Sequence, residues 1–81
     1  MQKGEVMERN YRKLGLILKI FPANLWYVIN IYESKIYLQG RYSSNLAKLI
    51  SKYMKINCIN ENGYLIFIKE QTSGNIEIIL T

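Results

Sequence analysis

Hydrophobic and polar positions alternate over much of the chain, which is the pattern of half-buried β-strands. Residues 25–32 and 35–42 are rich in Ile, Val, Tyr and Trp, and Glu33-Ser34 separates them. This arrangement predicts an antiparallel hairpin. The connection is either a two-residue turn or a four-residue loop over 32–35, and both choices keep the same pairing.

After the hairpin, the apolar residues change from the two-residue spacing of a strand to the spacing of a helix. Apolar side chains recur there at the i, i+3, i+4, i+7 spacing of one helix face: Leu46, Leu49, Ile50 and Tyr53. Ser43 or Ser44 can cap the first turn, because a serine oxygen accepts from a backbone N–H that has no helical partner. We therefore expect one amphipathic helix over about residues 44–54, packed on one face of the sheet.

The C-terminal part returns to strands. Residues 56–60 and 64–69 flank Asn62-Gly63, the strongest short hairpin signal in the chain. A turn over 71–75 then leads to a last strand over 76–81. The chain is therefore predicted to be an α+β domain with a mostly antiparallel sheet of about five or six strands.

The N-terminal segment is ambiguous within this single domain of residues 1–81. Residues 1–12 are polar and are expected to be mobile or loosely helical. Residues 13–20 fit two periods, because their apolar positions alternate as in a strand, whereas Met7, Tyr11, Leu14 and Leu18 would share a helix face. Gly15 is a poor helix residue, so the strand is favoured.

The hairpin pairing predicts which side chains share a face. If Ile31 stands opposite Ile36, Trp26 stands opposite Arg41, and opposed residues project to the same side of the sheet. The core face would hold Tyr27, Ile29, Ile31, Ile36, Leu38 and Gly40. The other face would mix aromatic, amide and basic side chains: Trp26, Val28, Asn30, Tyr32, Lys35, Tyr37, Gln39 and Arg41.

This mixed face has three interpretations. In the first, either the N-terminal segment covers the face or ordinary sheet composition accounts for it, since Trp and Tyr favour strands. A protein-binding surface also explains it, because Trp, Tyr and Arg are enriched at binding hot spots. The third is a nucleic-acid platform in which rings stack on bases. The residues predicted to bind a partner are Trp26, Tyr32, Lys35, Tyr37 and Arg41.

The C-terminal meander is apolar on both sides. With Glu61 opposite Tyr64 and Lys69 opposite Ile76, one side holds Ile56, Cys58, Leu65, Phe67, Ile78 and Leu80, so the thiol is expected to be buried. The other side is also apolar, and either the N-terminal segment or a second copy of the chain must cover it. Its candidate self-association residues are Ile59, Ile66, Ile68 and Ile79.

The net charge of +5 is concentrated near the N-terminus and in the expected helix. Lys48, Lys52 and Lys55 follow one another on the solvent side of that helix, which contains no acid. Such lysines keep a helix soluble and suit its C-terminal dipole. They also form a short basic stripe that could contact phosphates.

The usual catalytic inventory is missing. The chain has one Cys, no His and no Asp, which excludes Ser-His-Asp and Cys-His sites. Metal ligands would have to come from Cys58 and scattered Glu side chains. Glu33, Glu61 and Glu70 fall at predicted turns, so solvated turn residues are favoured over paired-carboxylate chemistry. The glycines form neither a P-loop nor a dinucleotide fingerprint. We therefore expect no enzyme, no cofactor and no small-molecule substrate.

Two sequence features bear on localisation. The apolar runs are too short to span a membrane, and the polar N-terminus does not resemble a secretory signal, so the cytoplasm is the expected compartment. The sequence then predicts a small non-catalytic module of the adaptor or inhibitor type, which binds a protein partner and forms a homodimer through its sheet. The alternative is a nucleic-acid-binding protein that uses the basic helix face and the aromatic face.

Overall fold

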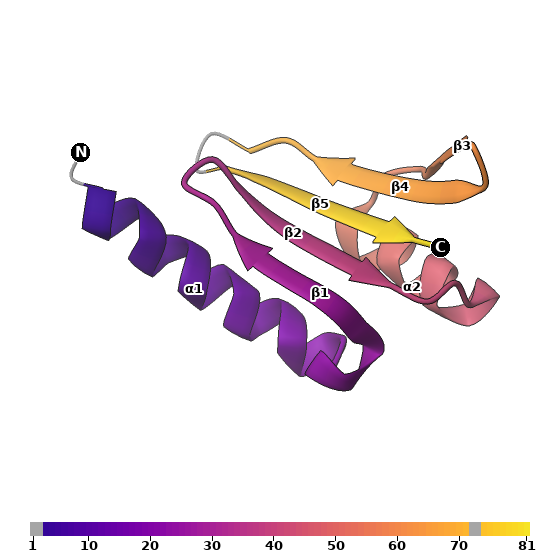
Figure 1. Ribbon diagram of the computed structural model, residues 1–81, viewed down its shortest axis with the longest axis horizontal. Coiled ribbons are helices and arrows are strands. Elements are labelled where there is room, and N and C mark those ends of the chain that lie inside the picture. The colour runs from indigo at the N-terminus through magenta and orange to yellow at the C-terminus, as the bar shows by residue number, and fades with distance from the viewer. Residues whose placement is uncertain (1–2, 72–73) are drawn as a thin grey trace.

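Two helices pack on one face of a five-stranded mixed sheet (Figure 1). The computed structural model describes residues 3–71 and 74–81. In chain order the elements are α1 (Lys3–Ile20), the 3-10 turn η1 (Ala23–Leu25), β1 (Trp26–Ile31), β2 (Lys35–Gly40), α2 (Ser44–Met54), β3 (Ile59–Glu61), β4 (Tyr64–Lys69) and β5 (Asn75–Leu80). The α+β class and the strand number are as predicted, whereas the expectation of one helix is wrong.

The strand order in the sheet is β1-β2-β5-β4-β3. Neighbouring strands are antiparallel except β2 and β5, which are parallel. Parallel strands need a long crossover, and here α2 and the β3–β4 hairpin together supply it. Figure 1 shows β5 lying between the two hairpins, so the last strand joins the two halves of the sheet.

The segment 13–20 is helical, so the strand prediction there is wrong. The buried positions of α1 and the residue after it follow helical steps of four and three, at Asn10, Leu14, Ile17 and Phe21. Leu16, which strand alternation would place beside Leu14, is 58% exposed. Gly15 costs the helix only about 1 kcal/mol, and burial of a whole helix face outweighs that cost.

The second helix has the predicted bounds, and Ser43 caps it. The Ser43 hydroxyl accepts a hydrogen bond from the Leu46 N–H at 3.4 Å. The helix ends at Lys55, whose φ of 57° lies in the left-handed region that stops a helix.

The buried stripe of α2 is narrower than its spacing predicted. Leu46, Ile50 and Met54 are buried, whereas Leu49 is 54% exposed and Tyr53 is also exposed. The helix contacts the core through a single row of side chains spaced four residues apart. Leu49 and Tyr53 each precede a member of this row by one residue, so they lie at its solvent-exposed margin.

The β1–β2 register is confirmed from Ile31 opposite Ile36 to Val28 opposite Gln39, and it then shifts by one residue. A bulge between Trp26 and Val28 places Trp26 opposite Gly40 and turns the indole into the core, where it is 7% exposed. The predicted Trp26–Arg41 pair is therefore wrong. The indole Nε1 donates to the Phe21 carbonyl at 3.1 Å, so the buried donor is satisfied.

The bulge also moves Tyr27 out of the core, where the unbroken pairing placed it. Tyr27 is exposed, and its hydroxyl donates to the Gly40 carbonyl at 3.1 Å and is hydrogen-bonded to the Thr81 hydroxyl. Backbone hydrogen bonds join the same residues at the ends of β2 and β5. The Thr81 N–H donates to the Gly40 carbonyl, and the Tyr42 N–H donates to the Thr81 carbonyl. These bonds extend the β2–β5 pairing beyond both strands.

The core lies between the helices and one face of the sheet. It contains Leu14, Ile17, Phe21, Trp26, Ile36, Leu38, Leu46, Ile50, Met54, Phe67, Ile76, Ile78 and Leu80. Asn10 is buried beside it, and its Nδ2 donates to the Tyr32 carbonyl at 2.8 Å, so α1 is attached to the β1–β2 connection. The N-terminal segment thus lies on the helical side and does not cover the opposite face.

Cys58 is exposed, contrary to the prediction of a buried thiol. It precedes β3, all of whose residues are exposed. The core extends only as far as β4. The apolar residues before β3 alternate with polar ones as in a half-buried strand, but no core lies beneath them to bury the Cys58 thiol.

Candidate functional site

Among the described residues, no helix covers one face of the sheet. Opposed residues in paired strands share a face, so the register defines the members of this surface. We call it the open face: Val28, Asn30, Lys35, Tyr37, Gln39, Ile59, Glu61, Tyr64, Ile66, Ile68, Asn75, Glu77 and Ile79, together with Tyr32, whose ring lies beside Lys35. None of these residues is buried, whereas Ile36, Leu38 and Ile78 on the core side are almost completely buried.

Isoleucines form one half of the open face. Ile59 pairs with Ile66, and Ile66 pairs with Ile79, so the three side chains form a row across β3, β4 and β5. Ile68 lies beside this row on β4 and is 40% exposed. The four residues predicted for self-association are thus contiguous on the described surface.

Tyrosines around one lysine form the other half. The Nζ of Lys35 lies 5.6 Å from the ring centre of Tyr32 and 5.7 Å from that of Tyr37. The same Nζ donates to Glu77 Oε2 at 2.8 Å. The hydrogen bond to Glu77 raises the pKa of Lys35, and the negative charge of Glu77 adds to this effect although partial burial opposes it. Glu77 therefore stabilises the charged form of Lys35 and serves as its counter-ion within the same face.

The amide side chains of this half also find partners within it. Asn30 Nδ2 donates to the Tyr32 hydroxyl at 3.4 Å, and the Tyr37 hydroxyl donates to Gln39 Oε1 at 3.3 Å. A polar group loses less when water is excluded if it already has a hydrogen-bond partner. The aromatic half can therefore be covered at a smaller desolvation cost than its composition indicates.

The remaining predicted site residues lie elsewhere. Trp26 is in the core, and Arg41 is exposed beyond the end of β2, beside a cavity on the helical side. The exposed lysines 48, 52 and 55 belong to α2, across the core from the open face. The aromatic platform and the basic stripe therefore lie on opposite sides of the molecule and cannot form one interface.

The described residues hold no group of three or more His, Cys, Asp or Glu side chains that could share a metal ion. Neither α1 nor α2, in the part of the chain with a described structure, is long and apolar enough to cross a membrane.

Comparisons of the chain with protein-family models, curated proteins and solved structures give no match. We therefore infer the function from the geometry of the open face and of the surfaces around it.

Sequence reasoning assigned the tyrosine–lysine group and the isoleucine group to separate surfaces. The parallel contact of β2 with β5 joins them, because it sets Tyr37 opposite Glu77 and Gln39 opposite Ile79. No local pattern marks that contact. The charge complementarity of Lys35 and Glu77, which are 42 positions apart, was the one signal that could have indicated it.

Proposed function

We propose that the chain is a non-catalytic module that acts through protein–protein contact, and that its open face binds the open face of a second copy. The observation that carries this proposal is the continuity of the face, in which an isoleucine row adjoins a tyrosine cluster without a covering element. Exposed apolar surfaces of this kind are typical of interaction sites.

The charge of the open face favours a second copy over nucleic acid. Its charged members are Lys35, Glu61 and Glu77, so the face is slightly acidic on a chain whose net charge is +5. Two copies can therefore approach through this face with little repulsion from their basic surfaces. A phosphate backbone, in contrast, is attracted to clusters of unpaired cations.

The size of the face sets the expected strength of the dimer. Six-residue strands extend about 20 Å, and five strands about 4.8 Å apart span a similar width, which gives about 400 Å² in projection. A standard interface buries about 800 Å² of accessible surface on each partner, so this one lies at the small end. We therefore expect a reversible dimer whose fraction rises with protein concentration.

Face-to-face contact is favoured over pairing at the edge of the sheet. The sheet has two outer strands, and neither offers a long regular row of backbone groups to another strand. Strand β3 has only three residues, Ile59–Glu61, and β1 is interrupted by the bulge between Trp26 and Val28. The open face instead gives a two-fold interface in which both copies use the same residues.

The test is the molar mass of charge-introducing variants, measured by light scattering after size exclusion. Ile66→Glu, at the centre of the isoleucine row, is expected to give a folded monomer, because each copy would bring an unpaired carboxylate into the interface. Leu16→Glu on α1 is the control, since Leu16 is an exposed apolar residue that lies on the helical side, outside the open face. It is expected to remain a dimer.

A second variant separates loss of association from loss of folding. Ile68 is more exposed than Ile66, so Ile68→Glu is expected to fold even if Ile66→Glu does not. Circular dichroism verifies the fold of each variant. A dimer that persists in folded Ile66→Glu and in folded Ile68→Glu would contradict the proposal.

Nucleic-acid binding is the second candidate function, and the exposure of lysines 48, 52 and 55 on an acid-free helix favours it. The double change Lys48→Glu and Lys52→Glu would then weaken binding to every sequence and flatten its salt dependence. Protein that co-purifies with no nucleic acid, and that shows no salt-dependent binding, would remove this candidate.

A further inference from the structure

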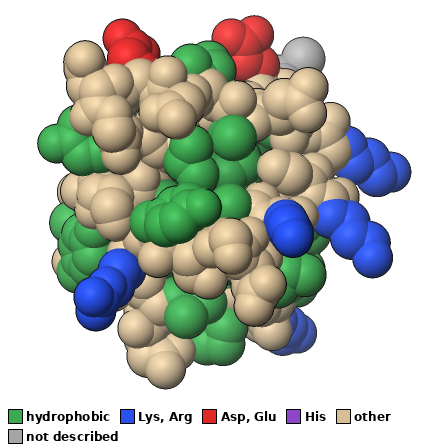
Figure 2. Space-filling view, turned by 90° about the vertical axis from the view of Figure 1, so that its right-hand side faces the viewer, with side chains coloured by type: hydrophobic (Ala, Val, Ile, Leu, Met, Phe, Trp, Pro, Cys, Tyr) green, Lys and Arg blue, Asp and Glu red, His purple; other side chains and the backbone are tan. Residues whose placement is uncertain are grey.

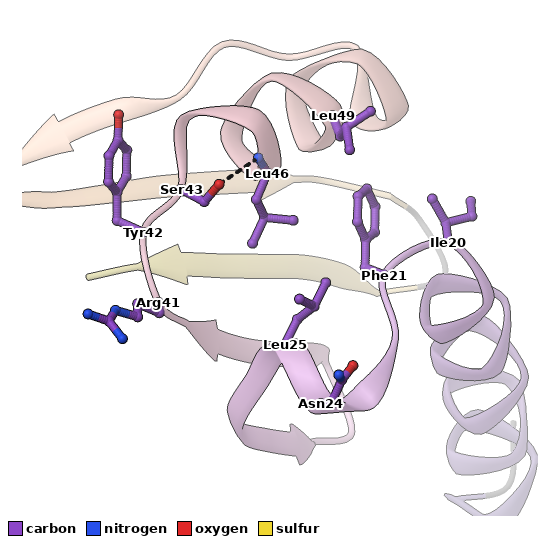
Figure 3. Close-up of a pocket in the computed structure, with 9 residues that line it drawn as sticks. All are labelled: Ile20, Phe21, Asn24, Leu25, Arg41, Tyr42, Ser43, Leu46 and Leu49. Carbon is purple, nitrogen blue, oxygen red and sulfur yellow. Dashed lines mark hydrogen bonds between the residues drawn. The ribbon is translucent and has the colours of Figure 1, made fainter.

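A cavity opens between the end of α1 and the start of α2 (Figure 3). Its volume is about 410 Å³, which falls within the range of small-molecule sites. Its lining comes from three chain segments: Ile20, Phe21, Asn24, Leu25, Arg41, Tyr42, Ser43, Leu46 and Leu49. The cavity is on the helical side of the sheet, so it is separate from the open face.

Most of the cavity wall is apolar. Phe21 and Leu46 are buried members of the core, and they form its floor. Leu25 and Leu49 are exposed and stand on either side. Figure 3 shows Leu25 and Leu46 extending toward the space between η1 and α2. An apolar chain placed over this floor would remove Leu25 and Leu49 from water.

The mouth of the cavity is cationic. Arg41 is the one charged residue in the described lining, and it makes no ion pair with any residue in the described ranges. Figure 3 shows its side chain extending away from the apolar side chains, so the guanidinium lies at the outer rim of the cavity. Ser43 marks the positive end of the α2 dipole at the same rim, and its hydroxyl already accepts from Leu46 N–H. No acid lines the cavity, so an anion at the rim would meet only favourable charge.

The molecular surface around the cavity also combines hydrophobic side chains with basic ones. Figure 2 looks onto the end of the molecule where β2 and β5 end and α2 begins. Hydrophobic side chains occupy the middle of this view, basic side chains project at its flanks, and acidic side chains lie at its upper edge. The long-range field at this end therefore attracts anions as well.

We propose that this cavity binds a single-chain amphiphile with an anionic head group, of the fatty-acid type. The apolar chain lies between Leu25 and Leu49 over Phe21, and the carboxylate meets the Arg41 guanidinium at the mouth. An Arg–carboxylate contact is a charge-assisted hydrogen bond, which is stronger than a neutral one. A purely apolar occupant would leave Arg41 unused, and a purely polar anion would leave the apolar walls wet.

Decanoate titrated into the protein and followed by amide chemical shifts tests this directly. Saturable shifts are expected around Phe21, Leu25, Leu46 and Leu49, with decanol as the uncharged comparison. Arg41→Gln is expected to weaken decanoate binding by about tenfold and to leave decanol binding unchanged. The matched control Lys48→Gln removes an exposed cation outside the cavity lining and should alter neither ligand.

A second pair of variants tests the apolar wall. Leu49→Ser should weaken both decanoate and decanol, whereas Leu16→Ser, which changes a similarly exposed leucine outside this cavity, should weaken neither. Shifts spread evenly over the surface, or equal losses in Arg41→Gln and Lys48→Gln, would overturn the proposal.

Co-sedimentation with vesicles of anionic phospholipid distinguishes the source of the amphiphile. Binding to decanoate alone supports a free fatty acid, and binding to both that is weakened by Leu49→Ser supports the same head-group and chain chemistry in a lipid. Binding to vesicles without saturable decanoate binding would overturn the cavity as the site.

Discussion

At the scale of single residues, Gly40 and Trp26 decide how β1 meets β2. A Cβ at position 40 would lie 2.8 Å from the Leu25 carbonyl oxygen and 2.8 Å from Trp26 Cε3. Real side chains do not approach so closely, so a larger residue must displace the indole or the backbone. The bulge that turns Trp26 into the core therefore depends on the glycine opposite it.

Gly40→Ala is accordingly predicted to lower the free energy of unfolding by about 1 to 3 kcal/mol, the usual cost of overpacking a core. Gly15→Ala is the matched control, because a Cβ there meets no atom within 4 Å. It is predicted to raise the free energy of unfolding by about 1 kcal/mol through helix propensity alone. Urea denaturation measures both, and a neutral Gly40→Ala would contradict the close contact.

The Lys35–Glu77 pair predicts a pH dependence. The folded-state pKa of Lys35 is raised by Glu77, so the pair stabilises the protein fully below the ordinary lysine pKa, about 10.4, and loses its effect as pH rises through the raised value. Because both side chains are partly exposed, Glu77→Gln should cost only about 0.5 kcal/mol at neutral pH. The stability curves of both proteins should begin to converge above about pH 10.4 and should meet once the pH exceeds the raised pKa of Lys35, whereas a difference independent of pH would contradict the pairing.

At the scale of elements, the orientation of α2 predicts different losses of stability for two neighbouring residues, the buried Ile50 and the exposed Leu49. Ile50→Ala is predicted to cost about 2 to 5 kcal/mol, because Ile50 is fully buried. Leu49→Ala is predicted to cost no more than about 0.5 kcal/mol, because its side chain already faces solvent. Chemical denaturation tests both, and equal costs would contradict the orientation of α2.

Elements with strong local signals were predictable. The Asn62-Gly63 dipeptide sets the β3–β4 pairing, and both residues adopt the positive φ that such a tight turn requires. The cap at Ser43 likewise fixed the start of α2. In each case the determining atoms lie within a few residues of one another, so the local sequence contains the cause.

Elements set by distant contacts were not predictable. The α1 region contains leucines that satisfy a strand period and a helix period alike, and only the burial of Ile17 and Phe21 against the sheet selects the helix. The bulge at Tyr27 depends on Gly40, which lies in the next strand. Trp26 and Arg41 were therefore assigned to the wrong surface.

At the scale of the whole molecule, the central feature is a two-layer fold whose sheet has one uncovered face. The parallel pairing of β2 with β5 makes that face continuous, because it sets the tyrosine cluster beside the isoleucine row. Sequence patterns placed Lys35 and Tyr37, and likewise Ile66, Ile68 and Ile79, on faces opposite the predicted core faces, but they also placed Trp26 there, which is buried. The two groups lie side by side because β2 pairs with β5, and the alternation of apolar and polar residues within a strand does not reveal which strands are neighbours.

The most direct test of this account is the molar mass of the unmodified chain by light scattering, measured over about a hundredfold range of concentration. The chain has a mass of 9.6 kDa, and self-association through the open face predicts a rise toward twice that value as concentration increases. The rise should be insensitive to salt, since the contact is apolar and its one ion pair is internal. A mass that stays at 9.6 kDa throughout would contradict the proposal that two open faces bind each other.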